Sequence, residues 1–160
     1  MGHKGLITVL KILAYGWMFY IPQIVALSVL GKLAGYSGLL AIFIAASVGY
    51  TLRALLMMAI SVGLMSIIFW KKPSIEFFKY FLPLSCWGIL SLLLRFANLI
   101  VPQILQVRIL IEQISLVMAW FVSYYRLGTL FRTDKNTTMW PIVGALLIGI
   151  LVFLLLPPPI

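Results

Sequence analysis

Acidic residues are nearly absent from this chain of 160 residues, which has three Asp and Glu against 12 Lys and Arg. It also has one histidine, His3, and one cysteine, Cys86. So few titratable side chains leave no pair of carboxylates, no catalytic triad and no cluster of metal ligands. We therefore predict that the chain is not an enzyme and that it uses neither a metal nor a cofactor. Cys86 has no disulfide partner, and its apolar neighbours predict a small, buried hydrophobic residue.

Charge of either sign is scarce as well: charged residues make up 9% of the chain, whereas hydrophobic residues make up 64%. Soluble domains carry about a quarter charged residues, so a water-soluble fold could not cover this much apolar surface. We predict that the lipid bilayer covers it. The basic residues stand singly or in small groups between apolar runs, which is typical of charges flanking membrane spans and not of a nucleic-acid-binding face.

The long apolar runs predict an all-α fold, a polytopic transmembrane helix bundle that forms a single domain over residues 1–160. Each run is close to the length of about 20 residues that crosses the hydrocarbon core. Pro22 should bend or break the first span, and residues 38–47 either extend the second span or form a re-entrant segment before it. Five spans are predicted, at about residues 6–30, 48–69, 81–101, 104–125 and 140–156.

Two polar connections separate these spans. In residues 71–80, Pro73 and Ser74 are typical of a helix start, and Glu76 and Lys79 alternate with aromatic residues. This pattern predicts a short helix in the membrane interface, with its rings in the acyl boundary. The second connection, residues 126–138, is typical of a water-exposed loop and carries Arg132, Asp134, Lys135 and Asn136.

The basic residues also predict an orientation. Five crossings place the N-terminus and both polar connections on one side, whereas Lys32 and Arg108 fall on the other. By the positive-inside rule, the N-terminus is cytoplasmic, and the expected location is the bacterial inner (plasma) membrane. The basic residues on the N-terminal side are Lys4, Lys71, Lys72, Lys79, Arg126, Arg132 and Lys135.

Polar residues inside the spans are the candidates for function, since a charge within the membrane is costly unless it is paired or hydrated. The candidate intramembrane polar site consists of Glu112, Arg95, Arg53, Asn98 and Gln113. The third and fourth spans are joined by a very short segment, so they should form an antiparallel hairpin with Arg95 and Glu112 at similar depth. Asn98 shares a helix face with Arg95 at i+3.

Other charges compete with this arrangement. Arg108 precedes Glu112 by four residues and is a second possible partner for the carboxylate. Lys11 lies near the end of its span and can extend its ammonium group to the headgroups. Glu112 with Arg95 or Arg53 could form a polar site or proton path, or a neutralising pair that fixes helix packing. We favour packing, because a proton path needs a chain of ionisable groups; a partner subunit could also supply the counter-charge.

The order of features from the second span onward resembles the Yip1 family of five-span membrane proteins. The resemblance implies a five-helix membrane protein without assigned catalysis, and it transfers no functional residue. The sequence departs from the family in its very short segment before the first span and in Lys71-Lys72-Pro73, where the family has glycines. The matching segments are Arg53–Trp70, Lys71–Tyr80, Phe81-Leu82-Pro83, Val101–Gln103, Ala119-Trp120-Phe121 and Tyr125-Arg126-Leu127-Gly128.

Two functions are compatible with this composition. The first is a non-catalytic scaffold or accessory subunit that works with other membrane protein subunits, and we favour it because extramembrane residues and reactive groups are so few. The second is a small transporter, channel or proton-conducting subunit that uses Glu112 and Arg95. Pairs of small residues at helical spacing predict close helix packing, mostly within the bundle. These pairs are Gly31/Gly35, Ala45/Gly49, Ala59/Gly63 and Ala145/Gly149.

Overall fold

The computed structural model describes residues 3–35, 37–72, 75–131 and 139–156, and this part of the chain is helical without any strand. The predicted all-α fold is therefore confirmed. Two 3-10 helices, η1 (Ile75–Phe81) and η2 (Pro102–Ile104), precede α3 and α4. The five α-helices are α1 (His3–Leu33), α2 (Leu39–Ile68), α3 (Leu82–Ile100), α4 (Leu105–Leu130) and α5 (Trp140–Leu155).

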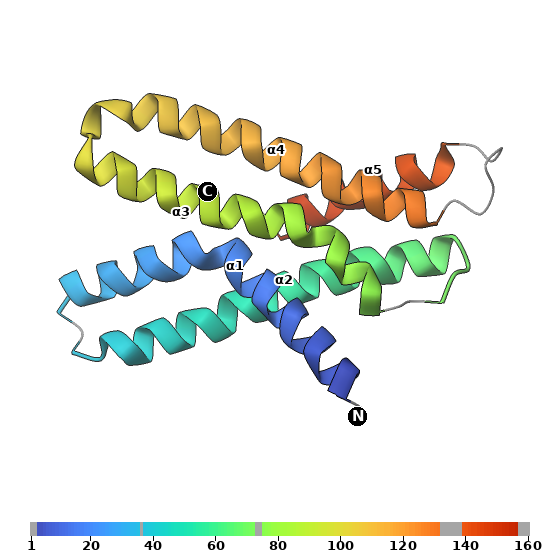
Figure 1. Ribbon diagram of the computed structural model, residues 1–160, viewed down its shortest axis with the longest axis horizontal. Helices are drawn as coiled ribbons and strands as arrows, with labels where there is room; N and C mark the ends of the chain where they lie inside the picture. The colour runs from blue at the N-terminus through green and yellow to red at the C-terminus, as the bar shows by residue number, and fades with distance from the viewer. Residues whose placement is uncertain (1–2, 36, 73–74, 132–138, 157–160) are drawn as a thin grey trace.

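The helices form two antiparallel hairpins, α1 with α2 and α3 with α4, and α5 lies beside the second of them (Figure 1). Each helix packs against two others, in the cyclic order α2, α1, α3, α4, α5 and back to α2. The bundle is therefore a closed ring of five helices. The segment η1 contacts α1, α2, α3 and α4. It covers the end of the bundle at which α2 and α4 end and α3 and α5 begin.

Four helices, α1 to α4, are long and apolar enough to cross a membrane. The fifth, α5, is apolar but has 16 residues, or about 24 Å at 1.5 Å per residue. It coincides with the predicted span at 140–156, and its crossing stays a prediction. The helix α2 is continuous from Leu39 to Ile68. Residues 39–47 therefore extend the second helix and do not form a separate re-entrant segment.

The helix α1 continues through Pro22 and bends partway along its length (Figure 1). Pro22 is the only proline inside this helix, and a proline removes one backbone hydrogen bond and clashes with the preceding turn. The predicted bend is thus present without a break. Close to it, Gly88 of α3 lies against α1: a Cβ at Gly88 would stand 2.0 Å from the carbonyl oxygen of Met18. Backbone contact here requires glycine.

The core is rich in aromatic residues and contains buried polar links between helices. The hydroxyl groups of Ser61 on α2 and Tyr124 on α4 lie 2.8 Å apart, and both side chains are fully buried. Of the predicted small-residue pairs, Ala145/Gly149 packs inside the bundle, since a Cβ at Gly149 would stand 2.8 Å from the Tyr124 ring. A Cβ at Gly49 or Gly63 would meet no atom within 4 Å, so the expectation of internal packing is wrong for these two glycines.

The predicted short helix is present as η1. Its Phe77 and Phe78 rings are partly buried against the core, and the Phe77 ring lies 5.4 Å from that of Phe131. The expected place of this helix in the membrane interface stays a prediction. One expectation is corrected by burial. Cys86 is exposed and not buried, because its neighbours Ser85 and Trp87 occupy the inward face of α3. The side chain of Glu76 lies outside the described residues.

Four of the basic residues predicted to share one side lie at the end of the bundle where α2 and α4 end and η1 lies; they are Lys71, Lys72, Lys79 and Arg126. Lys71, after α2, donates a hydrogen bond to the backbone carbonyl of Leu130, and its ammonium group lies 5.7 Å from the centre of the Phe131 ring. The α2–α3 connection and the end of α4 are thus joined at one end of the bundle. Arg132, Asp134, Lys135 and Asn136 lie outside the described residues, as does the side chain of Lys4.

Candidate functional site

The Glu112 carboxylate lies between two helices and is the centre of the candidate site. On α3, the Ser91 hydroxyl donates a hydrogen bond of 3.0 Å to Glu112 Oε1, and Arg95 Nε lies 3.4 Å from the same oxygen. On α4, Arg108 Nη1 lies 3.7 Å from it. The Glu112 side chain is 12% exposed, so one buried carboxylate oxygen has two cations and one hydroxyl around it.

The spacing of these residues along the chain explains why they meet. Trp87, Ser91 and Arg95 follow one another at intervals of four residues and so form one stripe along α3. Arg108 and Glu112 have the same spacing on α4. The short connection through η2 folds the two helices into a hairpin that brings these stripes face to face. Trp87 completes the contact, because its indole nitrogen donates a hydrogen bond of 2.9 Å to the backbone carbonyl of Glu112.

The predicted meeting of Arg95 and Glu112 is therefore present, and Arg108 joins them instead of displacing Arg95. The prediction missed Ser91 and Trp87, although their spacing from Arg95 was visible in the sequence. Arg95 is five residues from the end of α3 and Arg108 three residues into α4. At 1.5 Å per residue, both lie within about 8 Å of the hairpin end. The cluster thus lies near one end of the bundle.

The charges of this cluster do not balance. One carboxylate and two guanidinium groups leave a formal charge of one positive unit, because arginine keeps its charge inside proteins. Both cations approach the same oxygen, Oε1, and Arg108 Nε is a buried donor with no hydrogen-bond partner among the described residues. The cluster therefore fixes α3 to α4 and retains capacity for an anion.

The other three predicted residues are not part of this cluster. Gln113 is exposed on the outer side of α4, although it is the neighbour of Glu112 in sequence. Asn98 is partly buried on α3, and its Oδ1 has no hydrogen-bond partner in the described part of the chain. Arg53 lies on α2, where it interacts with Tyr20 of α1. The ion pairs of Glu112 in the described part of the chain are those with the two arginines of the hairpin, so the proposed pairing with Arg53 is not the one that forms.

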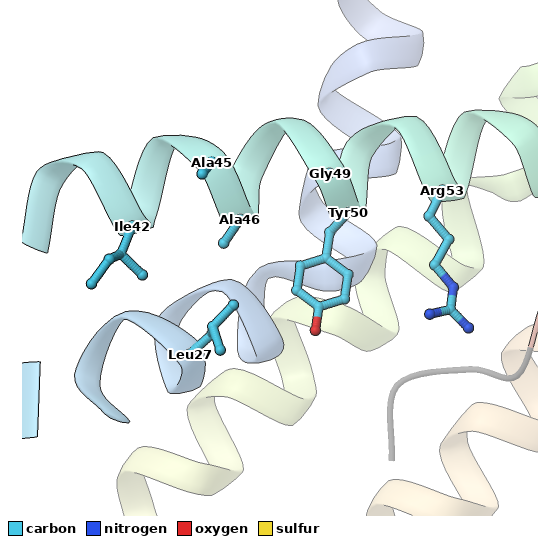
Figure 2. A pocket seen from close by; sticks show the side chains of 7 residues that line it. All are labelled: Leu27, Ile42, Ala45, Ala46, Gly49, Tyr50 and Arg53. Carbon is cyan, nitrogen blue, oxygen red and sulfur yellow. The ribbon is translucent and has the colours of Figure 1, made fainter. Parts of the chain in front are cut away.

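Arg53 belongs instead to a groove along α2, which Figure 2 shows from close by. The groove has a volume of about 500 Å³. Tyr50 and Arg53 extend from α2 toward the side on which Leu27 of α1 lies, and the Tyr50 ring stacks on that of Tyr20 with centroids 5.1 Å apart. The residues that line the groove are Leu27, Ile42, Ala45, Ala46, Gly49, Tyr50 and Arg53.

The residues of the Glu112 cluster can pair charges and join helices. Within the described residues, no group of three His, Cys, Asp or Glu side chains could hold a metal ion. The carboxylate of Glu112 on α4 is held by two cations. An arrangement of this kind neutralises charge and orients helices, and its surplus positive charge can attract an anion.

The helices and the buried ion cluster define the class of protein: an all-α bundle with four helices long and apolar enough to cross a membrane. Comparison of the chain with protein-family models, with curated proteins and with solved structures finds no match. The resemblance to the Yip1 family therefore stays a prediction.

Proposed function

We propose that the chain is a non-catalytic membrane protein that acts as a scaffold or accessory subunit of a larger membrane complex. The observation that carries the proposal is the groove along α2. It is lined by three small residues, Ala45, Ala46 and Gly49, and a Cβ at Gly49 would meet no atom within 4 Å. Small residues on a membrane helix let another helix approach closely. The groove therefore suits a transmembrane helix of a partner protein.

Arg53 gives the groove a chemical preference. It stands near the middle of α2, 14 residues after Leu39 and 15 before Ile68. A guanidinium at that depth favours an acidic or amide side chain on the approaching helix, because polar groups in the membrane are stabilised by hydrogen bonds between helices. The proposed partner is therefore a membrane subunit with a polar or acidic residue within one of its helices.

Two alanines of α2 provide a matched test. Ala45 and Ala59 are both exposed, but only Ala45 lines the groove. We expect Ala45→Leu to block the groove and abolish co-purification of the partner after mild detergent extraction, while Ala59→Leu leaves it intact. Native sizing of the wild type should give a complex larger than the 18.0 kDa chain. A strictly monomeric wild type, or equal behaviour of the two variants, would contradict the proposal.

The alternative function, a transporter, channel or proton-conducting subunit built on Glu112 and Arg95, has less support. Glu112 is held by Arg95, Arg108 and Ser91, and the two other acids of the sequence, Glu76 and Asp134, belong to the predicted connections between the spans. In liposomes, an active transporter would lose flux on Glu112→Gln while keeping its fold. A bundle that uses Glu112 for packing shows no flux in either form.

The proposal includes an orientation, with the N-terminus in the cytoplasm of a bacterial cell and the protein in its inner membrane. The gathering of Lys71, Lys79 and Arg126 at one end of the bundle supports it, since basic residues flank the cytoplasmic side of membrane spans. Reporter fusions after residue 72 and after residue 101 test the orientation. The first should report the cytoplasm and the second the opposite side, and the reverse result would overturn it.

A further inference from the structure

A second groove lies between α1, α3 and α4, on the side of the hairpin end. Its volume is about 360 Å³, within the range of about 300–1,000 Å³ that is usual for ligand pockets. Eight of its ten lining residues are apolar, and the two exceptions are the arginines of the Glu112 cluster. The lining residues are Pro22, Val25, Ala26, Val29, Leu30, Leu92, Arg95, Phe96, Leu99 and Arg108.

The path of α1 explains why this space is open. Residues 18 and 19 of α1 touch α3 at Gly88, where the two backbones are in contact. Pro22 is the first residue of α1 that lines the groove, and it bends that helix. Beyond this crossing, α1 lines the groove from Pro22 to Leu30 and α3 lines it from Leu92 to Leu99. The groove is therefore built into the way the two helices cross.

The groove carries a net positive charge. Arg95 and Arg108 carry two positive charges, and only Glu112 balances them. Arg108 Nε has no hydrogen-bond partner among the described residues. An anion bound at the two guanidinium groups would balance their surplus positive charge.

We propose that this groove binds one anionic phospholipid, with the phosphate against Arg95 and Arg108 where they line the groove and an acyl chain along the apolar wall. A lipid fits better than a soluble anion because exposed apolar residues, Val29, Leu30 and Leu99, form the rim. The arginines also lie within about 8 Å of the helix ends at the hairpin, close to the depth of lipid headgroups. Arginine is well suited to phosphate, because its guanidinium group can donate two parallel charge-assisted hydrogen bonds. This proposal uses a different groove from the one assigned to a partner helix, so each can fail alone.

Native mass spectrometry of the delipidated protein in detergent tests the proposal. The probes are dioleoyl phosphatidylglycerol, which is anionic, and dioleoyl phosphatidylcholine, which has no net charge. We expect the wild type to retain one phosphatidylglycerol that phosphatidylcholine does not displace. Arg108→Gln should weaken this binding about tenfold or more, as expected for the loss of a charge-assisted hydrogen bond. Arg126→Gln, the same change at an exposed site outside the groove, should leave it unchanged.

A second pair of variants keeps every charge and tests the shape of the groove. Val29 and Val117 are similarly exposed, at 52% and 61%, and only Val29 lines the groove. Val29→Trp should abolish retention of phosphatidylglycerol, whereas Val117→Trp should not. Equal retention of the two lipids by the wild type would overturn the proposal. So would unchanged binding in both Arg108→Gln and Val29→Trp, or displacement of the lipid by inorganic phosphate alone.

Discussion

Replacing Glu112 by glutamine keeps the size of the side chain and removes its charge, which isolates the electrostatic role of the cluster. The introduced amide could still accept the hydrogen bond from Ser91, but Arg95 and Arg108 would face each other without an anion. Removing one partner of a buried ion pair costs about 3–5 kcal/mol. The Arg95 and Glu112 side chains are 26% and 12% exposed, so solvent and headgroups screen part of the repulsion. We expect a loss of about 2–3 kcal/mol in the free energy of unfolding.

Unfolding of the detergent-solubilised protein by increasing mole fractions of sodium dodecyl sulfate, followed by circular dichroism, measures this loss. A double-mutant cycle with Arg108→Gln separates the pairwise interaction from general damage. The double variant should be more stable than the sum of the two single effects predicts, with a coupling of about 0.5–3 kcal/mol. Wild-type stability of Glu112→Gln, or zero coupling, would refute the packing role of the cluster. Loss of ion or proton flux without loss of stability would favour the transporter.

Further variants test the packing of the bundle. Gly88→Ala should cost more than the about 1–3 kcal/mol of ordinary overpacking, because its Cβ would meet the backbone of Met18 at 2.0 Å. Gly63→Ala, whose Cβ would meet no atom within 4 Å, should stabilise α2 by up to about 1 kcal/mol through its higher helix propensity. Thermal unfolding in detergent compares the two variants. Similar stability of both would show that α1 and α3 do not touch at Gly88. Tyr124→Phe should cost about 0.6–1.5 kcal/mol in the same unfolding assay, since it removes the buried hydrogen bond to Ser61. If the losses of stability in Tyr124→Phe and Ser61→Ala add up in the double variant, the hydrogen bond between these side chains does not contribute to stability.

The hairpin of α3 and α4 is the part of the structure that the sequence predicts best. A connection of a few residues forces two apolar helices to lie antiparallel, and the interval of four residues fixes which side chains share a face. These two local facts suffice to bring Arg95 and Glu112 together. The same spacing places Ser91, four residues before Arg95, on the face of α3 that meets Glu112. A single serine in an apolar helix does not by itself indicate that it donates a hydrogen bond to a carboxylate.

Contacts between helices that are distant in sequence could not be predicted in this way. The periodicity of α2 does not indicate which helix packs beside it, so the sequence leaves Arg53 as a second possible partner of Glu112. For the same reason, the spacing of small residues does not indicate which of them pack against another helix. Gly49 stands in a regular pair with Ala45 and lines a groove, whereas Gly88 has no such partner and lies against the backbone of α1. Gly88 contacts backbone atoms of α1, and such a contact does not depend on which side chains α1 carries, so no sequence pattern indicates it.

The short α5 has a consequence for the surrounding lipid. With 16 residues it extends about 24 Å, whereas α2 with 30 residues extends about 45 Å. The hydrocarbon core is about 30 Å thick. If α5 crosses it as predicted, the bilayer has to become thinner beside this helix or be replaced there by another protein, whereas α2 can fit by tilting. Covering the flank of α5 would then lower the free energy of an assembly that contains the chain.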